Sequence, residues 1–175
     1  MEIQTTRLII RKIEMADASS ILEAMECPEV HQMHSNGFTN IEKVQSYIDV
    51  LSKEYNSEKY RTLAIAEKST NQLIGLITLD VMSVFSRVEY CYWVNKKYRK
   101  IGYATETIIA MNEYCFNSLD VNRIQAMTSN PASEKVLEKS GMIYEGTLRQ
   151  YFGMNGVYWD VKMYSILHSD FTCIK

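Results

Sequence analysis

The stretch from residue 87 to residue 118 constrains the fold more than any other part of the chain. Residues 87–94 (RVEYCYWV) form a β-rich run whose side chains would alternate between the two faces of a strand. Residues 103–118 instead predict a helix, with apolar side chains at helical spacing at Ala104, Ile108, Met111 and Cys115. The loop between them contains Lys96, Lys97, Arg99, Lys100 and Gly102. A strand that leads through such a loop into a helix indicates a mixed α/β domain.

The segments before this unit predict a strand, two helices and two further strands. Residues 7–12 (RLIIRK) form a short apolar run, and Asp17 is expected to cap a helix that ends before Pro28. Thr39 and Glu42 match a capping box. The helix after them has an apolar stripe at Ile41, Val44, Ile48, Leu51 and Tyr55. Residues 62–67 and 72–81 are β-rich, with a turn at 68–71.

The segments after the 103–118 helix predict a strand, a helix and a hairpin. Residues 123–129 form the strand, and Asn130-Pro131 is a helix start that leads to Gly141 as its end. The last strands, 143–152 and 157–166, flank Asn155-Gly156, a strong hairpin signal. The order is β-α-α-β-β-β-α-β-α-β-β, which predicts one α/β domain over residues 1–175.

Composition excludes several classes of protein. The net charge of −2 gives no general attraction to nucleic acid or to an anionic membrane. The cysteines, at positions 27, 91, 115 and 173, form no C-x-x-C pair and predict reduced thiols in a cytoplasmic protein. His31 and His34 have a spacing that could place two imidazoles on one face, but no further metal-ligand pattern accompanies them. We therefore expect no metal, no nucleic acid and no membrane among the partners.

The cationic loop has two interpretations. The first-turn amides of the following helix lack partners and carry the positive end of the helix dipole, and Gly102 lets the backbone approach a ligand. These features suit a pyrophosphate or similar oligoanion. A solvated surface loop is the other interpretation, because short charge runs usually lie on the surface. The chain has neither a G-x-x-x-x-G-K-[ST] nor a G-x-G-x-x-G sequence, which excludes two common nucleotide sites.

Five ordered segments resemble the GCN5-related N-acetyltransferases (GNAT), in particular the RimJ/RimL-like branch that acetylates ribosomal-protein N-termini. They are TTRLIIRK at 5–12, EYCYWV at 89–94, YRKIGYATE at 98–106, NPASEKVLEKSGM at 130–142 and GVYWDVKMYSIL at 156–167. The resemblance implies an acyltransferase that uses acetyl-CoA as acetyl donor. It also implies a mostly antiparallel sheet of about seven strands, splayed in the middle and flanked by about four helices.

The resemblance assigns a set of residues to the acetyl donor. The loop amides would hold the pyrophosphate of coenzyme A, through Arg99, Lys100, Ile101, Gly102, Tyr103, Ala104 and Thr105. The pantetheine arm would bond to the strand edge at Trp93 and Val94, as an added strand does. Asn130 and Ser133 match the N-x-x-S of the family, and Lys139 matches its K-x-G-F segment, although Met142 replaces the Phe.

Glu89 is the leading candidate for the general base, on the same strand face as Cys91 and Trp93. The alternative is an edge glutamate paired with Arg87 or another cation. A backbone N–H near Val94 could stabilise the oxyanion, and the amine would attack the thioester directly. Many relatives have a Tyr where this chain has Leu137, which leaves the acid that protonates the thiolate open. Ser133 is a candidate for it, whereas an acyl-Cys91 route is disfavoured.

The acceptor side carries weaker signals. His31, His34 and Asn36 lie in a segment that borders the acceptor cleft in related folds, and Tyr151 and Tyr158 lie near the hairpin that overhangs it. Trp159 and Asp160 match a W/Y-D pair of the branch, for which structural roles are favoured. The acceptor is expected to be a protein N-terminal amine, with a small-molecule amine as the alternative. A CoA sensor or a nucleic-acid module using residues 96–100 is the non-enzymatic alternative, and the sequence leaves open whether the chain forms a homodimer.

Overall fold

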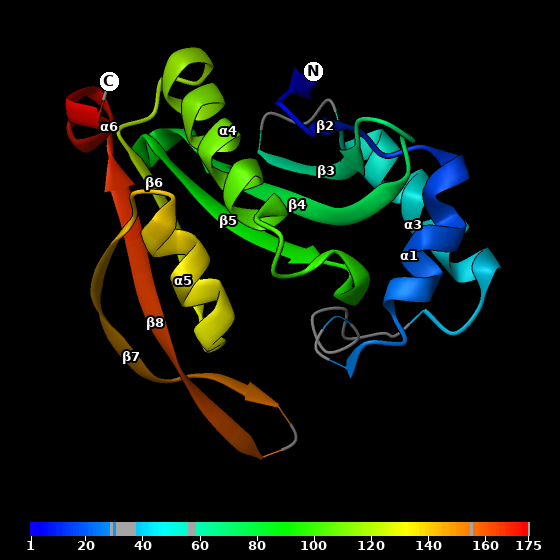
Figure 1. Ribbon diagram of the computed structural model, residues 1–175. Coiled ribbons are helices and arrows are strands. Elements are labelled where there is room, and N and C mark those ends of the chain that lie inside the picture. Colours follow the sequence, from blue (N-terminus) through cyan, green and yellow to red (C-terminus); the bar gives the residue numbers. More distant parts are fainter. Residues whose placement is uncertain (29, 31–37, 56–58, 155, 175) are drawn as a thin grey trace. The chain divides into compact units, whose positions relative to one another are not determined.

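The computed structural model describes residues 1–28, 30, 38–55, 59–154 and 156–174 (Figure 1). These residues divide into two compact units, Met1–Leu79 with Tyr92–Thr107, and Asp80–Cys91 with Ile108–Lys175. Strands β4 (Leu73–Met82) and β5 (Arg87–Val94) and helix α4 (Tyr103–Ser118) each continue from one unit into the other. The strands form one sheet in the order β1-β2-β3-β4-β5-β6-β8-β7. The single domain expected over residues 1–175 stays a prediction.

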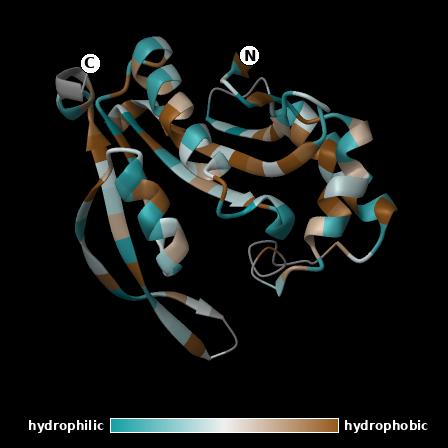
Figure 2. Ribbon diagram, viewed as in Figure 1, coloured by the Kyte–Doolittle hydropathy of each residue, from teal (hydrophilic) through white to brown (hydrophobic). Residues whose placement is uncertain are grey.

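The first unit contains antiparallel strands and two helices packed on them. It comprises β1 (Ile3–Gln4), β2 (Leu8–Lys12), α1 (Ala18–Ala24), α3 (Ile41–Glu54), β3 (Tyr60–Glu67) and most of β4. Strand β2 pairs antiparallel with β1 and β3. Strand β4 is hydrophobic over most of its length (Figure 2), and its first five residues are all buried. Such a continuous apolar run is expected for a strand covered on both faces.

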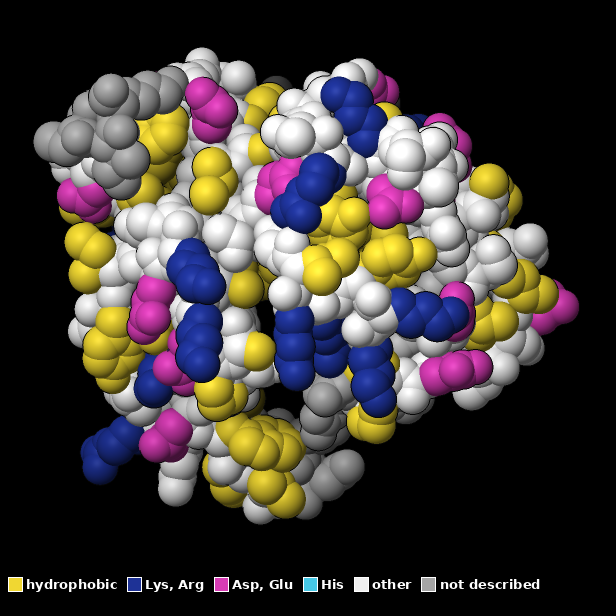
Figure 3. Space-filling model, viewed as in Figure 1, with side chains coloured by type: hydrophobic (Ala, Val, Ile, Leu, Met, Phe, Trp, Pro, Cys, Tyr) yellow, Lys and Arg dark blue, Asp and Glu magenta, His cyan; other side chains and the backbone are white. Residues whose placement is uncertain are grey.

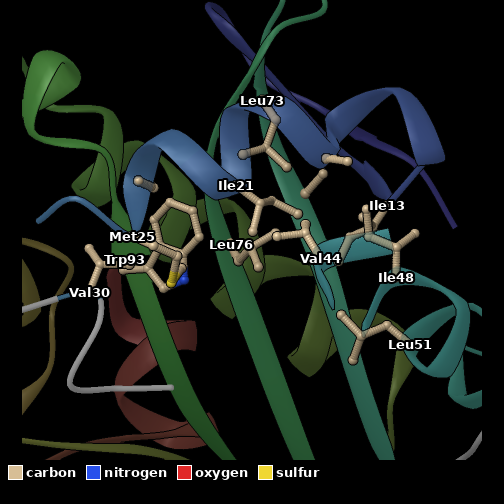
Figure 4. Close-up of a cluster of buried hydrophobic side chains, with 13 residues drawn as sticks. Ile13, Ile21, Met25, Val30, Val44, Ile48, Leu51, Leu73, Leu76 and Trp93 are labelled. Atoms are coloured by element: carbon tan, nitrogen blue, oxygen red, sulfur yellow. The ribbon is translucent and has the colours of Figure 1, made fainter. Parts of the chain in front are cut away.

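A cluster of buried side chains fills the core of this unit. Ile21 from α1, Val44 and Ile48 from α3, and Leu76 from β4 are each at most 1% exposed and belong to it (Figure 4). Burial of one such side chain contributes about 1.5–3 kcal/mol to folding. The apolar stripe predicted for α3 is confirmed by the burial of Val44, Ile48 and Leu51.

Two helix caps differ from the prediction. The side chain of Asn40, not of Thr39, caps α3 by accepting a hydrogen bond from the amide of Lys43. The side chain of Asp17 does not cap α1. It accepts two hydrogen bonds from Arg11, at 2.8 and 2.9 Å, and both side chains are less than 10% exposed. The carboxylate of Asp17 therefore neutralises the buried guanidinium of Arg11 instead of capping α1. Hydrogen bonding to Asp17 raises the pKa of Arg11.

The second unit is built on β5, β6 (Arg123–Thr128), β8 (Val157–Leu167) and β7 (Ile143–Met154), with α5 (Pro131–Lys139) and α6 (His168–Ile174). Strand β6 pairs parallel with β5 and antiparallel with β8. The start predicted for α5 is confirmed, because Asn130 accepts from the amide of Ala132 and Pro131 occupies the first turn. Gly141 follows with a φ of 86°, as expected for a helix end.

The mixed, mostly antiparallel GNAT-like sheet is confirmed, with some elements added. Strand β1 and helix α6 were not predicted, since two residues of strand and a short terminal helix leave little periodic signal. The described residues thus form eight strands where about seven were expected. Within these residues, no helix is both long and apolar enough to cross a membrane.

Candidate active site

The pairing of β5 ends before the strand does. Parallel pairing with β6 runs from Arg87↔Arg123 to Tyr90↔Ala126, but β5 continues for four more residues to Val94. The pairing thus stops on the strand at which splaying of the sheet was expected, and the splaying itself stays a prediction. Beyond Tyr90, one backbone edge of β5 is no longer bonded to β6.

Within the first unit, the end of β5 presents Val94 on the edge that faces away from β4. The amide of Asn95 donates to the carbonyl of Ile74 on β4 at 2.8 Å. Because successive backbone groups of a strand point to opposite edges, the N–H and C=O of Val94 point away from β4. The Val94 carbonyl accepts from Nε of Arg99 at 2.9 Å. Its N–H thus points to the edge of β5 at which the pantetheine contact was predicted, and that contact stays a prediction.

Trp93 has the opposite orientation. A Cβ atom placed on Gly75 of β4 would lie 2.3 Å from the Trp93 carbonyl oxygen, so this carbonyl lies against β4. The indole is 5% exposed and belongs to the core cluster of Figure 4. Gly75 is required there because any side chain would clash with the neighbouring backbone. The contact predicted for Trp93 stays a prediction, and the geometry favours Val94 for that contact.

The loop between β5 and α4 has an unusual backbone. A short 3-10 helix, η3 (Lys96–Tyr98), begins after Asn95, whose side chain accepts from the amide of Lys97. Lys100 and Gly102 then have φ values of 67° and 92°, in the left-handed region. Among the described residues, no acceptor is hydrogen-bonded to the amides of residues 100–105. Left-handed residues followed by a helix start expose such amides together and form an anion-binding concavity.

The back of the loop is tied to the N-terminal segment. Arg7 donates from Nη1 to the carbonyl of Ile101 at 2.9 Å and from Nε to Glu106 at 2.7 Å. Thr5 donates to the other carboxylate oxygen of Glu106 at 2.6 Å, and the Arg7 guanidinium stacks over the ring of Tyr103 at 4.6 Å. Burial alone would raise the pKa of Glu106, but the hydrogen bonds from Thr5 and Arg7 outweigh it and lower this pKa. No sequence signal identified this contact, since about 100 residues separate the partners.

The four cations of the loop differ in their surroundings. Arg99 turns inward to the Val94 carbonyl, and Lys97 pairs with Glu23 of α1. Lys96 and Lys100 are exposed, and neither forms an ion pair with a residue that the structure describes. Figure 3 shows Lys and Arg side chains gathered around the segment that joins β5 to α4. The loop therefore offers free amides and uncompensated positive charge, which fits an oligoanion.

In the second unit, Glu89 is held by an amide rather than by a cation. Nε2 of Gln125 donates to Oε2 of Glu89 at 2.6 Å. The alternative ion pair with Arg87 is not formed, because the Arg87 guanidinium contacts Sδ of Met82 and the ring of Phe85. Among the described residues, Oε1 of Glu89 accepts no hydrogen bond. The half-buried carboxylate thus keeps one oxygen available to receive a proton.

Cys91, two residues further along β5, is not activated. Desolvation by the surrounding protein and the nearby charge of Glu89 both raise the pKa of its thiol, although the residue is accessible. A reactive cysteine requires a lowered thiol pKa. The structure therefore agrees with the view that Cys91 is not a nucleophile.

Helix α5 positions three further predicted residues. Asn130 uses its side-chain oxygen for the helix cap at 2.9 Å from Ala132 N, which leaves its NH₂ group for other partners. Ser133 is half-buried in the first turn, and Lys139 is the exposed last residue. Leu137, at the position of the family tyrosine, is fully buried and cannot act as an acid. Contacts of Asn130, Ser133 and Lys139 with coenzyme A stay predictions.

The residues predicted for the acceptor lie partly outside the described chain. His31, His34 and Asn36 fall outside it. Tyr151 and Tyr158 are 52% and 63% exposed on the β7–β8 hairpin, and their contact with an acceptor stays a prediction. Asp160 accepts a hydrogen bond from the amide of Gln150, whose φ is 51°, at an irregularity of β7. The structural role favoured for Asp160 is confirmed. No group of three or more potential ligands within the described residues could hold a metal.

Comparisons with known proteins agree on one family. The acetyltransferase (GNAT) domain family matches residues 7–143. YoaA, an uncharacterized N-acetyltransferase of Bacillus subtilis, is 32% identical over 171 residues, which cover 94% of this chain and 96% of YoaA. A GNAT-family acetyltransferase structure from Bacillus anthracis superposes with a TM-score of 0.84 at 27% identity, over 97% of this chain and 99% of that one. A RimL structure at 16% identity has a TM-score of 0.83 over 95% and 98% of the two chains, which shows the same fold. The chain belongs to the GNAT family of acetyltransferases.

Proposed function

We propose that this acetyltransferase transfers the acetyl group of acetyl-CoA to the α-amino group of a protein N-terminus, as in the RimJ/RimL-like branch. The exposed side chains of the β7–β8 hairpin are the observation that supports a peptide acceptor. The hairpin exposes Tyr151, Phe152, Val157 and Tyr158, each at least half exposed. Such amphipathic and apolar side chains suit a peptide, whose backbone and side chains present mixed chemistry.

The same hairpin has few carboxylates that could bind a polycation such as a polyamine. Residues 143–167 contain two acidic residues, Glu145 and Asp160. Glu145 accepts from Arg123 and Ser165, and Asp160 accepts from the amide of Gln150. A polyamine site requires carboxylates that can pair with several positive charges. This hairpin therefore favours the peptide over the polyamine.

The relatives include proteins named for a ribosomal acceptor and proteins named for a polyamine acceptor. YdaF of Bacillus subtilis, a putative ribosomal N-acetyltransferase, is 32% identical over 98 residues, about half of each chain. The spermidine N(1)-acetyltransferase of Vibrio cholerae is 26% identical over 164 residues, 86% of this chain. The second match makes a small-molecule amine the second candidate acceptor.

The residues present fit acetyl-CoA as donor. The free amides of residues 100–105 would hold the pyrophosphate, and Gly102 lets it approach the backbone. The Val94 N–H would donate to the carbonyl oxygen as negative charge develops there. Ser133 and solvent are candidates for supplying a proton to the departing sulfur.

Glu89 would accept the proton that the amine loses when its nitrogen bonds to the carbonyl carbon and the carbon–sulfur bond breaks. We expect Oε1 of Glu89 to accept this proton directly or through an ordered water.

A thiol-release assay tests this function. The panel consists of a peptide with a free N-terminal Ser or Ala, the same peptide with a blocked N-terminus and an internal Lys, spermidine, and free amino acids. We expect the free N-terminal peptide to have the highest kcat/KM. A higher value for spermidine or an amino acid would replace the proposed acceptor. A rise in Tm with acetyl-CoA but no thiol release from any amine would indicate a binding protein.

A further inference from the structure

Glu89 lies at the end of a chain of hydrogen bonds that crosses four strands of the second unit. Gln125 of β6 donates to Glu89 at 2.6 Å, and Nε of Arg123 donates to Oε1 of Gln125 at 2.9 Å. Arg123 also donates from Nη1 and Nη2 to the two carboxylate oxygens of Glu145 on β7. Ser165 of β8 donates to Glu145 at 2.7 Å.

The order of donors along this chain is fixed by chemistry. A guanidinium has donors but no acceptor, so it can bond to the oxygen end of the Gln125 amide and not to its nitrogen end. The NH₂ end must then face Glu89. If the amide flipped, nitrogen would face the guanidinium and oxygen would face the carboxylate, with both hydrogen bonds lost. Gln125 is 4% exposed, so water would not compensate for such a loss.

The remote end of this series of hydrogen bonds is an ion pair with two hydrogen bonds. Two donors of Arg123 grip both oxygens of Glu145, and this contact, ahead of the one from Ser165, lowers the pKa of Glu145 to about 2. The charged pair is therefore intact at neutral pH, and hydrogen bonding to Glu145 raises the pKa of Arg123. Arg123 thus holds Gln125 in one orientation, and Gln125 binds one oxygen of Glu89 and leaves Oε1 for the incoming proton.

We propose that Gln125 is a positioning residue for acetyl transfer, which acts by holding the carboxylate of Glu89, and that Arg123 sets the orientation of the Gln125 amide. This inference rests on the proposed role of Glu89 as general base. A misplaced base loses proton-transfer rate without losing affinity for the acetyl donor. The expected signature is therefore a lower kcat with an unchanged KM for acetyl-CoA.

The test compares Gln125→Met, Gln125→Glu and Glu89→Gln with the wild type, in the thiol-release assay. Met has a similar length but no amide, and we expect kcat to fall about tenfold while KM for acetyl-CoA stays within about twofold. Gln125→Glu should lose more, because a second carboxylate cannot donate to Glu89 and repels it. Tyr90→Phe is the matched control: it removes a buried side-chain hydrogen bond, to Cys115, from the same strand. We expect kcat of Tyr90→Phe to stay within about twofold.

A double mutant separates positioning from a general structural role. In the Glu89→Gln background, Gln125→Met should cause no further loss of kcat, because its effect passes through Glu89. An equal loss in both backgrounds, or an unchanged kcat of Gln125→Met, would overturn the proposal. If Gln125→Met is unfolded by Tm, Arg123→Met replaces it, with an expected loss of about threefold that Arg123→Lys partly restores.

The assay also distinguishes failure of this inference from failure of the proposed function. Absence of thiol release by the wild type with every amine rejects the function. Unchanged turnover of Glu89→Gln rejects the base, and with it the positioning role. Reduced turnover of Glu89→Gln together with normal turnover of Gln125→Met rejects the positioning role alone.

Discussion

The loop before α4 presents backbone atoms to its ligand, whereas the Glu89 network presents a side chain held by other side chains. In the loop, the free amides of residues 100–105 follow from two left-handed residues and a helix start, all local in sequence. In the network, Glu89, Gln125, Arg123 and Glu145 come from three strands that are distant in sequence. A backbone site tolerates changes of side chain but not of backbone geometry, and a side-chain network has the opposite sensitivity.

The largest effect is expected from Gly102→Val. A β-branched residue is strained at a φ of 92°, and its Cβ would lie 3.3 Å from Nη2 of Arg7. The loop must then rearrange, and we expect the affinity for coenzyme A to fall on the order of 100-fold, which corresponds to about 2.7 kcal/mol. Isothermal titration with coenzyme A measures this directly.

Gly156→Val is the control for backbone strain alone. Gly156 has a φ of 76° in the β7–β8 hairpin, and a Cβ placed on it would have no described atom within 4 Å beyond its own chain neighbours. The variant should lose stability, as Gly102→Val does, but bind coenzyme A like the wild type. Equal affinity losses in the two variants would show that strain, and not the loop amides, determines binding.

Glu106→Gln should have the next largest effect. It removes the negative charge that accepts hydrogen bonds from Arg7 and Thr5. The contact between the N-terminal segment and the loop before α4 is thereby weakened. We expect about tenfold weaker binding of coenzyme A, since a charged hydrogen-bonded contact contributes about 1.5–3 kcal/mol. Glu42→Gln is the matched control, because Glu42 occupies the first turn of α3 as Glu106 does in α4. An unchanged affinity of Glu106→Gln for coenzyme A would mean that the loop keeps its shape without the charged contact of Glu106 with Arg7 and Thr5.

The same contrast explains what could be predicted from the sequence. The bounds of β5 and α4 agree with the expected 87–94 and 103–118, because the change from strand to helical periodicity is encoded locally. The Asn130 cap and the Gly141 helix end were predictable for the same reason. Glu89 could be selected from its strand position and from the family resemblance.

The partners of these residues could not be predicted. Gln125 meets Glu89 because β5 and β6 pair in the register Glu89↔Gln125, and a shift by one residue would place Gln125 on the other face. Arg7 meets Glu106 through contacts between segments that are distant in sequence. Asp17 was expected to cap α1 from local pattern alone, but the buried charge of Arg11 recruits its carboxylate. In each case the partner is set by how strands and helices pack together, which the local sequence pattern does not encode.

A smaller effect is expected from Glu145→Gln, which removes a pH-dependent contribution to the free energy of unfolding. The pKa of Glu145 in the folded state, about 2, lies below the ordinary value of 4.5, so its stabilising effect is complete above about pH 4.5 and is lost as the pH falls toward 2. Since its side chain is 39% exposed, water screens the pair and we expect about 1 kcal/mol or less. The difference in free energy of unfolding between wild type and Glu145→Gln, measured in urea from pH 7 to pH 2.5, should shrink at low pH. In an Arg123→Met background this pH dependence should disappear, and its persistence would assign it to another group.

The smallest effect is expected from Lys97→Met, which separates the charge of the loop from its backbone. The ammonium of Lys97 pairs with Glu23 and its side chain is 68% exposed, so it is partly neutralised and screened by solvent. If the amides of residues 100–105 carry recognition, Lys97→Met should change the dissociation constant of coenzyme A by about twofold or less at about 150 mM salt. At low salt the association rate should fall more than this, because exposed charges mainly steer an anionic ligand. Lys100→Met, in which the lost charge has no described ion-pair partner, should show the same behaviour with a larger salt dependence. An affinity loss in Lys97→Met comparable to that of Gly102→Val would show that side-chain charge, and not the backbone, dominates this part of the site.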